Sequence, residues 1–311
     1  MKKIISYILF LGFVFLAISG WLLLGPTVSA PKSGYLKIKS GSDIESVKQS
    51  LSRENICNSY IFGFYASLLD YKNHIRPGKY KINDHSNLLQ LIRKLYSGRQ
   101  EEVRLVINKL RTKEDFAKLI SEQLEPDYEE ALRFLTSNDS LEKFDSDTNT
   151  VMTLVIPNSY LFWWNGSMSK IMQRLKKQHD YFWERRASKA KALGLTPVQV
   201  YTIASIVEEE TSRDADKGKI ASVYLNRLRK RMRLEADPTV KYALRDFTLT
   251  RILHGHLDHP SPYNTYRTMG LPPGPICTPS ITTIDAVLNA PATNYLFFVA
   301  KPDFNGYSNF A

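Results

Sequence analysis

An uninterrupted apolar segment near the N-terminus constrains this chain more than any other feature. From Ile4 to Leu24 the sequence carries no charged residue. A helix over these residues rises 1.5 Å per residue and is about 30 Å long, which matches the hydrocarbon core of a bilayer. Lys2 and Lys3 precede it and predict that the N-terminus lies in the cytoplasm and the rest of the chain outside. We therefore expect residues 1–26 to form a cytoplasmic tip and a single transmembrane anchor.

A cleaved signal peptide is the alternative interpretation of the same segment. Val28-Ser29-Ala30 resembles the small-residue motif at which signal peptides are cut. The apolar core of a signal peptide is usually shorter, about 7 to 15 residues. The length of the apolar run therefore favours an uncleaved anchor.

The rest of the chain has the composition of a globular protein. With 311 residues, of which 43% are hydrophobic, it can bury enough apolar surface for about two domains. A formal net charge of +11, placed outside a membrane, suits anionic lipid headgroups or an anionic wall polymer, and the anchor argues against nucleic acid as a partner. Two cysteines, Cys57 and Cys277, exclude a disulfide framework and leave one long-range bridge open.

Strand and helix patterns predict a small α+β module followed by a helix-rich region. In the module we expect a strand at 35–39, a helix from a capping box at 42–45 to residue 51, a helix at 59–69, a strand at 77–82 and a helix at 86–96. A strand at 103–107 and helices at 112–123 and 127–136 follow. The polar segment 137–149 reads as a loop before the second domain. Beyond it we expect helices at 169–193, 196–211, 220–231 and 284–288, a short helix capped by Asp237-Pro238, a Pro/Gly-rich loop at 261–280 and a strand at 295–300.

The helix predicted at 196–211 ends in a run of carboxylates. Thr196, Pro197 and Gln199 form a capping-box start, and Val200, Ala204 and Glu208 then follow at four-residue steps on one face. Glu208 therefore continues an apolar stripe, where desolvation raises the pKa of a carboxyl group, as a general acid requires. The alternative is a solvated acidic helix end, since structural charge clusters are common.

Several motifs beyond this helix resemble one known family. In order along the chain they are ASIVEEET (204–211), SVYLNRL (222–228), ADPTVKYAL (236–244), SPYNTYRTMGLPPGPICTPS (261–280) and NYLFFVAKPD (294–303). Together they are similar to the endolytic murein transglycosylases of the YceG-like family. The resemblance covers most of residues 157–303, and the module at 35–107 resembles, more weakly, the LysM-like segment of that family.

The resemblance implies four segments and an activity. These are the anchor (1–26), a LysM-like module (27–110), a connecting helical segment (111–156) and a helix-rich α+β catalytic domain (157–311) that lacks its C-terminal end. Family members are inner-membrane enzymes that cut nascent peptidoglycan at the β-1,4 bond between N-acetylmuramic acid and N-acetylglucosamine, leaving 1,6-anhydro ends. The resemblance makes Glu208 the catalytic residue, implies no cofactor or metal, and makes peptidoglycan strands, the inner membrane and cell-wall synthases the expected partners.

The reaction explains why one carboxyl group is enough. A glycoside hydrolase needs two carboxyl groups, one as acid and one to activate water or attack the anomeric carbon. In a lytic transglycosylase the 6-hydroxyl of the sugar attacks instead. A single glutamate can protonate the leaving oxygen and then accept the proton of that hydroxyl, for which a pKa near neutrality is best.

Further residues are candidates for substrate binding or for support of the site. In the Pro/Gly-rich loop, Tyr263, Asn264 and Tyr266 can hold a sugar ring by stacking and hydrogen bonding, or can fasten the loop to the core. Arg227 can pair with Asp237 or Glu210, or meet a carboxylate of the substrate, and Asn226 is open to the same roles. Glu210 can steer the local field or form a salt bridge.

Two features of the sequence do not fit the family pattern neatly. His254, His256, Asp258 and His259 are close in sequence, but their spacing matches neither a helical zinc motif nor a finger. The segment from Asn305 to Ala311 stands where family members continue with a His-containing segment and a further helix, and Ser308 lies near the expected His.

Two other functions remain open from the sequence. A non-catalytic peptidoglycan-binding or scaffold protein would keep the fold without turnover, although it would have no chemical reason to retain Glu208. A hydrolytic muramidase would need a second carboxylate, for which Glu209, Glu210 and Asp237 are candidates. The kind of chain end that is produced distinguishes the three.

Overall fold

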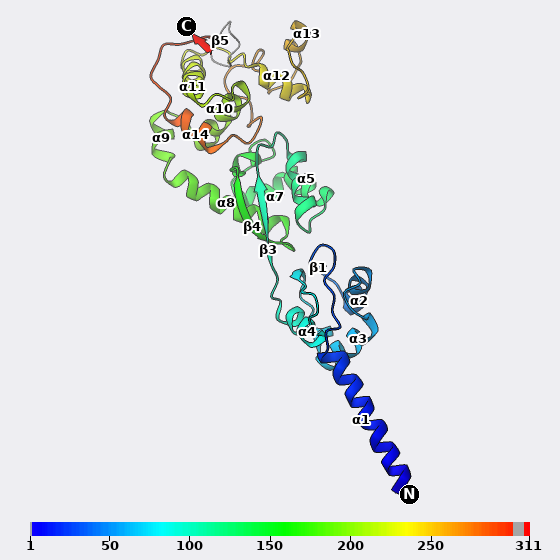
Figure 1. Cartoon of the computed structure of the whole chain (residues 1–311). Helices are drawn as coiled ribbons and strands as arrows, with labels where there is room; N and C mark the ends of the chain where they lie inside the picture. Colours follow the sequence, from blue (N-terminus) through cyan, green and yellow to red (C-terminus); the bar gives the residue numbers. More distant parts are fainter. Residues whose placement is uncertain (1, 301–307) are drawn as a thin grey trace. The chain divides into compact units, whose positions relative to one another are not determined.

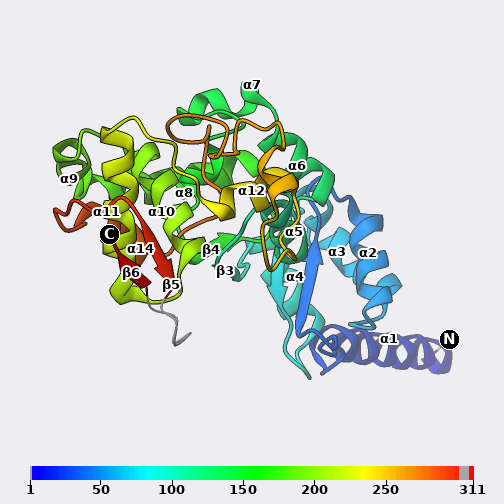
Figure 2. The same ribbon diagram turned by 90° about the horizontal axis from the view of Figure 1, so that it is seen from above.

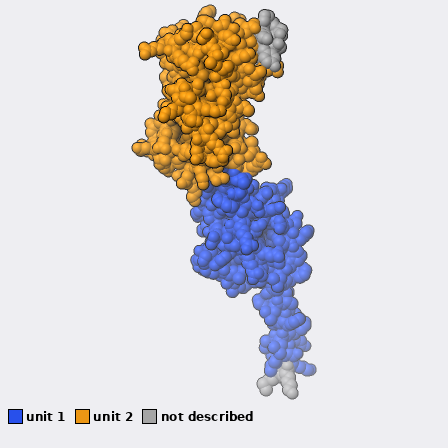
Figure 3. All heavy atoms as spheres, turned by 90° about the vertical axis from the view of Figure 1, so that its left-hand side faces the viewer, with its two compact units in different colours: residues 1–103, 123–125, 161–166 blue, residues 104–122, 126–160, 167–311 orange. Residues whose placement is uncertain are grey.

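The computed structural model describes residues 2–300 and 308–311. It divides into two compact units, which Figure 3 distinguishes by colour. Unit 1 comprises residues 1–103, 123–125 and 161–166, and unit 2 comprises residues 104–122, 126–160 and 167–311. By contacts alone, the predicted connecting segment 111–156 therefore falls almost entirely in unit 2. The four-segment division stays a proposal.

Unit 1 begins with helix α1 (Lys2–Leu24), which stands at the N-terminal, dark-blue end of the ribbon (Figure 1). Its apolar side chains are mostly exposed. Residues 3–24 form the one helix in the described part of the chain that is long and apolar enough to cross a membrane. An exposed apolar helix has no favourable environment in water. The structure confirms the predicted apolar helix, which ends at Leu24 as the sequence indicated.

The rest of unit 1 packs three helices against a two-stranded sheet. The sheet joins β1 (Tyr35–Ile38) to β2 (Gly78–Lys81) in antiparallel register. The helices are α2 (Ile44–Arg53), α3 (Ser59–Leu68) and α4 (Leu88–Ser97), with a short 3₁₀ turn η1 (Tyr71–Asn73) after α3. Their buried side chains form one core that includes Leu36, Leu51, Phe62, Tyr80 and Leu95.

Two helix starts in unit 1 differ from the prediction. Asp43, not Ser42, caps α2, because its carboxylate accepts the backbone N–H of Ser46 at 2.8 Å. Helix α4 begins two residues later than predicted, after a capping box between Asn87 and Gln90. In both places another polar residue nearby offers the better geometry for the free N–H groups of the first turn.

A second two-stranded sheet joins β3 (Glu102–Ile107) to β4 (Asn158–Trp163). The short elements between these strands are α5 (Lys113–Gln123), α6 (Tyr128–Leu135), α7 (Asn138–Leu141), η2 (Glu142–Phe144) and η3 (Val151–Leu154). The loop predicted at 137–149 is therefore wrong in its first half, where α7 and η2 lie. Ser137 caps α7, and Leu141 and Phe144 are buried.

The C-terminal helices of unit 2 include one that is buried, α10 (Pro197–Glu210), which contacts four of the helices near it. The others are α8 (Met168–Glu184), α9 (Ala187–Ala192), α11 (Asp214–Arg229), α12 (Asp237–Leu244), α13 (His254–Leu257) and α14 (Ile281–Leu288). Helices α10, α11 and α14 pack against one another, as both ribbon views make visible (Figures 1 and 2). This three-helix packing positions the acidic end of α10.

Several bounds in unit 2 correct the prediction. The single helix expected at 169–193 is two helices, interrupted at Arg185 and Arg186. Helix α11 begins at Asp214, six residues before the expected start, and α12 begins at Asp237 itself, which therefore does not cap it. The loop expected at 261–280 is confirmed.

The C-terminal strands are short. Strand β5 (Phe298–Ala300) pairs antiparallel with β6 (Ser308–Phe310). Residues 301–307, which include the end of the NYLFFVAKPD motif and the start of the segment 305–311, lie outside the described residues. With small sheets and many helices, the described chain has the mixed α+β character that the sequence predicts, and both cysteines are free thiols.

Candidate active site

Helix α10 delivers the candidate catalytic residue from the centre of unit 2. Its start is the predicted capping box: Thr196 accepts the backbone N–H of Gln199, whose side chain accepts that of Thr196 at 2.9 Å. Every residue from Val200 to Val207 is buried. A helix that is apolar all round belongs in a core. The helix end is consequently held by packing on several sides.

Residues of two other helices, α14 and α11, bind the Glu208 carboxylate. Its Oε2 accepts the hydroxyl of Ser280, the capping residue of α14, at 3.0 Å, and also the hydroxyl of Thr283. The ammonium group of Lys217 on α11 lies 3.5 Å from the same oxygen. The Glu208 side chain is 16% exposed, which agrees with its predicted place at the end of an apolar stripe. Within the described residues, Oε1 has no hydrogen-bond donor, so this oxygen keeps its capacity to bond with a ligand.

Glu209 is a structural anion. Lys109 lies 3.0 Å and Arg111 3.1 Å from its carboxylate, and both cations follow strand β3 directly in the chain. Burial alone would raise the pKa of Glu209, but the bonds from Arg111 and Lys109 hold it below its usual value. This carboxylate stays charged and ties the end of α10 to the segment after β3.

Glu210 has a raised pKa. Burial raises the pKa of Glu210 to about 7, and the charge of Asp237 acts in the same direction. The hydroxyl of Tyr224 on α11 donates to its Oε1 at 2.6 Å. The sequence predicted a raised pKa for Glu208, and for that residue it stays a prediction. No feature of the local sequence distinguishes Glu210, because Tyr224 reaches it from another helix.

Asp237 and Tyr266 form a second tyrosine–carboxylate pair. The Tyr266 hydroxyl donates to Oδ1 of Asp237 at 2.6 Å. Asp237 raises the pKa of Glu210, so the two pairs are electrostatically coupled. The structure therefore brings Glu210, Asp237 and Tyr266 into one network, in which Asp237 pairs with Tyr266 and not with Arg227.

Asn226 and Arg227 serve as fasteners of the segment before β5. The amide of Asn226 donates to the carbonyl oxygens of Thr293 and Tyr295. Arg227 donates to the carbonyl oxygens of Leu296, Arg233 and Leu234, and it pairs with Glu235 at 3.0 Å. Of the roles that the sequence left open for Arg227, these contacts favour a structural ion pair. Its partner is Glu235 and not Asp237 or Glu210, because the chain turn at 233–235 supplies nearer acceptors.

Tyr263 and Asn264 lie in the loop but are turned toward the protein. The Tyr263 ring packs on Tyr242, with ring centroids 4.7 Å apart. Asn264 is fully buried, and its amide donates to the carbonyl oxygens of Leu257 and His259. Of the two roles the sequence left open for Asn264, these contacts favour fastening of the loop.

The residues that hold Glu208 were not identified from the sequence. Lys217 was missed because the predicted helix began at Ile220, beyond it. Ser280 and Thr283 were missed because the predicted helix began at Ile284. The structure places the start of α14 earlier, where the Ser280 side chain accepts the backbone N–H of Thr283. Serine is one of the residues preferred at a helix start. A search for helix caps before 284 would have found them.

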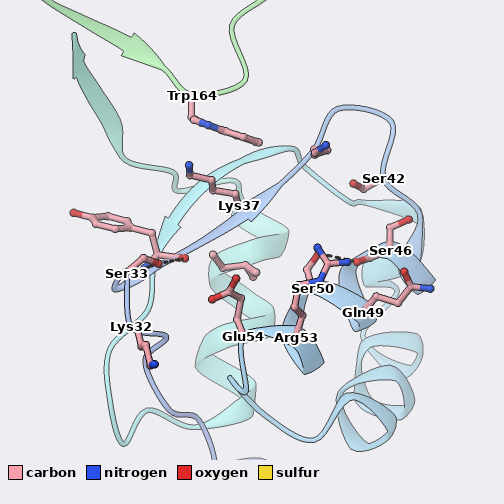
Figure 4. A pocket seen from close by; sticks show the side chains of 13 residues that line it. Lys32, Ser33, Lys37, Ser42, Ser46, Gln49, Ser50, Arg53, Glu54 and Trp164 are labelled. Carbon is pink, nitrogen blue, oxygen red and sulfur yellow. Dashed lines mark hydrogen bonds between the residues drawn. The ribbon is translucent and has the colours of Figure 1, made fainter. Parts of the chain in front are cut away.

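A separate, basic groove lies in unit 1. It has a volume of about 630 Å³, and Figure 4 shows the side chains that line it. They include four cations and, among the lining residues described, one carboxylate, that of Glu54: the cations are Lys32, Lys37, Lys39 and Arg53. Serine hydroxyls and the Trp164 ring complete the wall. The groove suits an anionic or hydroxyl-rich ligand and has no pair of carboxyl groups for acid–base chemistry.

The charge of this groove is reinforced across the sheet. Lys37 on β1 stands directly opposite Lys79 on β2. Burial lowers the pKa of Lys79, and the charge of Lys37 lowers it further. Like charges placed opposite each other destabilise a strand pair. Positive charge at this position therefore has a cost in stability that an anionic ligand would offset.

Comparison with known proteins agrees with this architecture. The model of the YceG-like family matches residues 36–311. A protein of Bacillus subtilis strain 168 named endolytic murein transglycosylase is 30% identical over 287 residues, which are 86% of this chain and 78% of that protein. One of the same name from Streptococcus pneumoniae strain D39 is 25% identical over 85% of this chain and 53% of its own length. A crystal structure of a YceG-like protein from Listeria monocytogenes superposes with a TM-score of 0.59 at 26% identity, covering 89% of this chain and 95% of that one. The chain thus belongs to the YceG-like family.

Proposed function

We propose that this protein is a membrane-anchored endolytic lytic transglycosylase. It cuts the β-1,4 bond between N-acetylmuramic acid and N-acetylglucosamine in peptidoglycan and leaves 1,6-anhydro-N-acetylmuramic acid ends. The observation that carries this proposal is the position of Glu208, whose Oε2 is fixed by Ser280 and Thr283 while Oε1 has no donor in the described chain. The name of the relatives supports the same substrate and reaction.

The fixed geometry of Glu208 suits a reaction in which its carboxyl group first donates one proton to the substrate and then accepts one from it. The hydroxyls of Ser280 and Thr283 donate to Oε2, so a proton on the carboxyl group resides on Oε1. That proton goes to the glycosidic oxygen as its bond to the anomeric carbon breaks. The sugar 6-hydroxyl oxygen then bonds to the anomeric carbon and returns its proton to Oε1. The reaction consumes no water and needs no second carboxylate.

Lys217 assists the middle of this cycle. After Glu208 gives up its proton, its carboxylate carries a negative charge, and the Lys217 ammonium 3.5 Å away stabilises that charge. The Lys217 side chain is 7% exposed and also pairs with Asp214 at 2.9 Å, so its position is fixed. A pre-positioned charge of this kind lowers the barrier without reorganisation.

Hydrolytic muramidase activity is the second candidate, and Glu210 is the observation that favours it. A carboxyl group with a pKa of about 7 is protonated enough at neutral pH to act as an acid. Glu208 would then act on water or on the anomeric carbon. The two candidates differ in the chain end they produce, since hydrolysis adds a water that transglycosylation does not.

The proposed location follows from α1. Helix α1 spans the membrane with Lys2 and Lys3 in the cytoplasm, so the rest of unit 1 and the whole of unit 2 lie outside. In the LysM-like module, the basic groove at Lys32, Lys37, Lys39 and Arg53 contacts the glycan strand or the anionic groups attached to it.

Mass spectrometry of uncrosslinked glycan strands tests the function. The full chain in detergent is incubated with strands, beside Glu208→Gln, Glu210→Gln and, as a matched control on an exposed glutamate, Glu235→Gln. We expect ends lighter by one water for the wild type and Glu235→Gln, and a loss of at least about 100-fold for Glu208→Gln. Ends of hydrolytic mass, lost in both Glu208→Gln and Glu210→Gln, would establish the muramidase instead. Unchanged cleavage by Glu208→Gln would overturn both candidates.

A further inference from the structure

Helix α3 carries a stripe of large apolar side chains that faces away from the core. Tyr60, Phe64 and Leu68 are 82%, 62% and 66% exposed, and their four-residue spacing puts them on one face. We refer to these three residues as the α3 stripe. The opposite face, with Phe62 and Ala66, is fully buried in the core of unit 1. Helix α3 is therefore apolar on both sides, which is unusual for a helix that borders water.

The same helix is joined to the apolar helix α1. The hydroxyl of Tyr65 donates to the carbonyl oxygen of Ser19 at 2.9 Å. Leu23 of α1 packs against the core of unit 1, together with Tyr65 and Ile61 of α3. These contacts make the last turns of α1 part of the folded unit.

The contact with Ser19 sets the level of α3 along α1. Ser19 precedes Leu24, the last residue of α1, by five positions, or about 7.5 Å at the helical rise. Amphipathic helices that lie in a membrane interface bury their apolar face by about 5 to 10 Å. The Tyr65 hydroxyl therefore lies at the depth of an interfacial helix, measured from the end of α1.

The composition of this region fits the same environment. Aromatic side chains gather at membrane interfaces, where a ring is buried and a polar group meets water. Tyr60 and Phe64 supply aromatic rings on α3, and Trp21 of α1, 65% exposed, supplies another close to the level of Ser19. Lys48 lies 5.8 Å from the centre of the Tyr60 ring, and its charge is paired with that of Glu45 at 2.8 Å.

We propose that α3 is a second membrane contact, in which Tyr60, Phe64 and Leu68 insert into the outer-leaflet interface of the bilayer. The partner is the lipid surface itself, because the helix that carries the stripe is joined to the proposed membrane anchor α1 by the Tyr65–Ser19 hydrogen bond. The inference rests on the proposed anchoring by α1. Two helices of unit 1, α1 and α3, then contact the bilayer, and together they fix the height of the rest of the unit above the membrane surface.

Spin-label accessibility in liposomes tests this placement. The full chain, with Cys57→Ser and Cys277→Ser, receives a single nitroxide at Phe64→Cys, at Phe13→Cys in the middle of α1, or at Gln49→Cys on the exposed side of α2. It is reconstituted at a low protein-to-lipid ratio in phosphatidylcholine with phosphatidylglycerol, and each variant is first checked for an unchanged melting temperature. Collisions with oxygen, which concentrates in the bilayer, are compared with collisions with a water-soluble nickel chelate.

We expect oxygen to dominate at positions 64 and 13 and the nickel chelate to dominate at position 49. If position 64 behaves like position 49 while position 13 is in lipid, the proposal is wrong and the anchoring by α1 stands. If position 13 also contacts the nickel chelate, the anchoring and the inference both fail. Shielding of position 64 from both reagents, or dipolar broadening between labels, would mean that protein covers the stripe, and would likewise overturn the proposal.

Discussion

Three consecutive glutamates at the end of α10 have three different environments. Glu208 is held by two hydroxyls and a lysine, Glu209 by two cations, and Glu210 by a tyrosine. The three differ because successive helical positions are rotated by about 100° and so face different neighbours. The same side chain therefore serves as candidate catalyst, as structural anion and as a carboxyl group with a raised pKa.

Glu210→Gln should change the pH dependence of stability. The pKa of Glu210 rises from 4.5 to about 7 on folding, so its contribution to stability is fully present below about pH 4.5 and is lost as the pH rises through about 7. The wild type should therefore lose up to about 3 kcal/mol between pH 5 and pH 8 relative to Glu210→Gln. Denaturant unfolding of both proteins at the two pH values measures this difference. A difference that is constant with pH would contradict the raised pKa.

Arg227 and its exposed partner should differ strongly in their effect on stability. Replacing the buried Arg227 by Ala leaves the buried carbonyl of Leu234 and its neighbours without a donor, and we expect a loss of about 3 kcal/mol in the free energy of unfolding. The Glu235 side chain is 45% exposed, so Glu235→Gln should cost less than about 1 kcal/mol. Equal losses in the two variants would mean that the ion pair, not the backbone contacts, stabilises this turn.

At the residue scale, the sequence predicted the position of Glu208 but not its surroundings. Face spacing from Val200 to Ala204 to Glu208 is a local property, and it placed the carboxylate beside the core correctly. Ser280 and Thr283 lie more than seventy positions away, since the contacts join residues 72 and 75 apart. Which distant hydroxyl meets a given carboxylate depends on helix packing, and no local pattern encodes it.

At the element scale, the start of α10 was the most predictable. The box of Thr196 and Gln199 identified the start of α10 to the residue. The polar segment after residue 136 was wrongly predicted to be a loop. Ser137 instead caps a short helix, and two buried apolar residues hold that helix and the turn after it. Asn, Asp and Ser are frequent both in loops and at caps. Composition alone therefore could not separate the two.

Thr196→Ala should measure what this cap contributes to α10. The variant loses the bond to the Gln199 N–H, and we expect the free energy of unfolding to fall by about 1 kcal/mol. Thr250→Ala, at an exposed position outside the regular elements, is the matched control and should stay within about 0.5 kcal/mol of the wild type. Denaturant unfolding midpoints of the two variants provide the comparison. Equal midpoint shifts would mean that the Thr196 cap does not stabilise α10.

At the scale of the whole molecule, the sequence predicted an apolar helix and two folded regions, but the compact units divide at other positions. The boundary was expected near residues 137–149, where the composition is most polar. The first change of unit instead comes between residues 103 and 104, within strand β3. A sheet strand gives no compositional break, so a boundary of this kind leaves no trace in residue usage.

The orientation proposed for the chain is open to direct measurement. In a Cys57→Ser, Cys277→Ser background, a cysteine at the exposed position Ser52 should react with a membrane-impermeant maleimide in intact cells. The part of unit 1 that follows α1 lies outside if Lys2 and Lys3 stay in the cytoplasm. A cytoplasmic protein with an exposed thiol is the control and should stay unlabelled. Labelling of Ser52→Cys only after permeabilisation would reverse the proposed orientation.

The discontinuity of unit 1 affects how the chain is made. Glu125 accepts both the backbone N–H and the hydroxyl of Ser40, and its own N–H donates to the carbonyl of Trp164. Residues 161–166 therefore complete a unit that began at the first helix. At about 5 to 20 residues per second, a ribosome adds them roughly 3 to 12 s after residue 103. During that interval the nascent chain carries both strands of the first sheet without the segments that close the unit, and a chain released before residue 161 would never complete it.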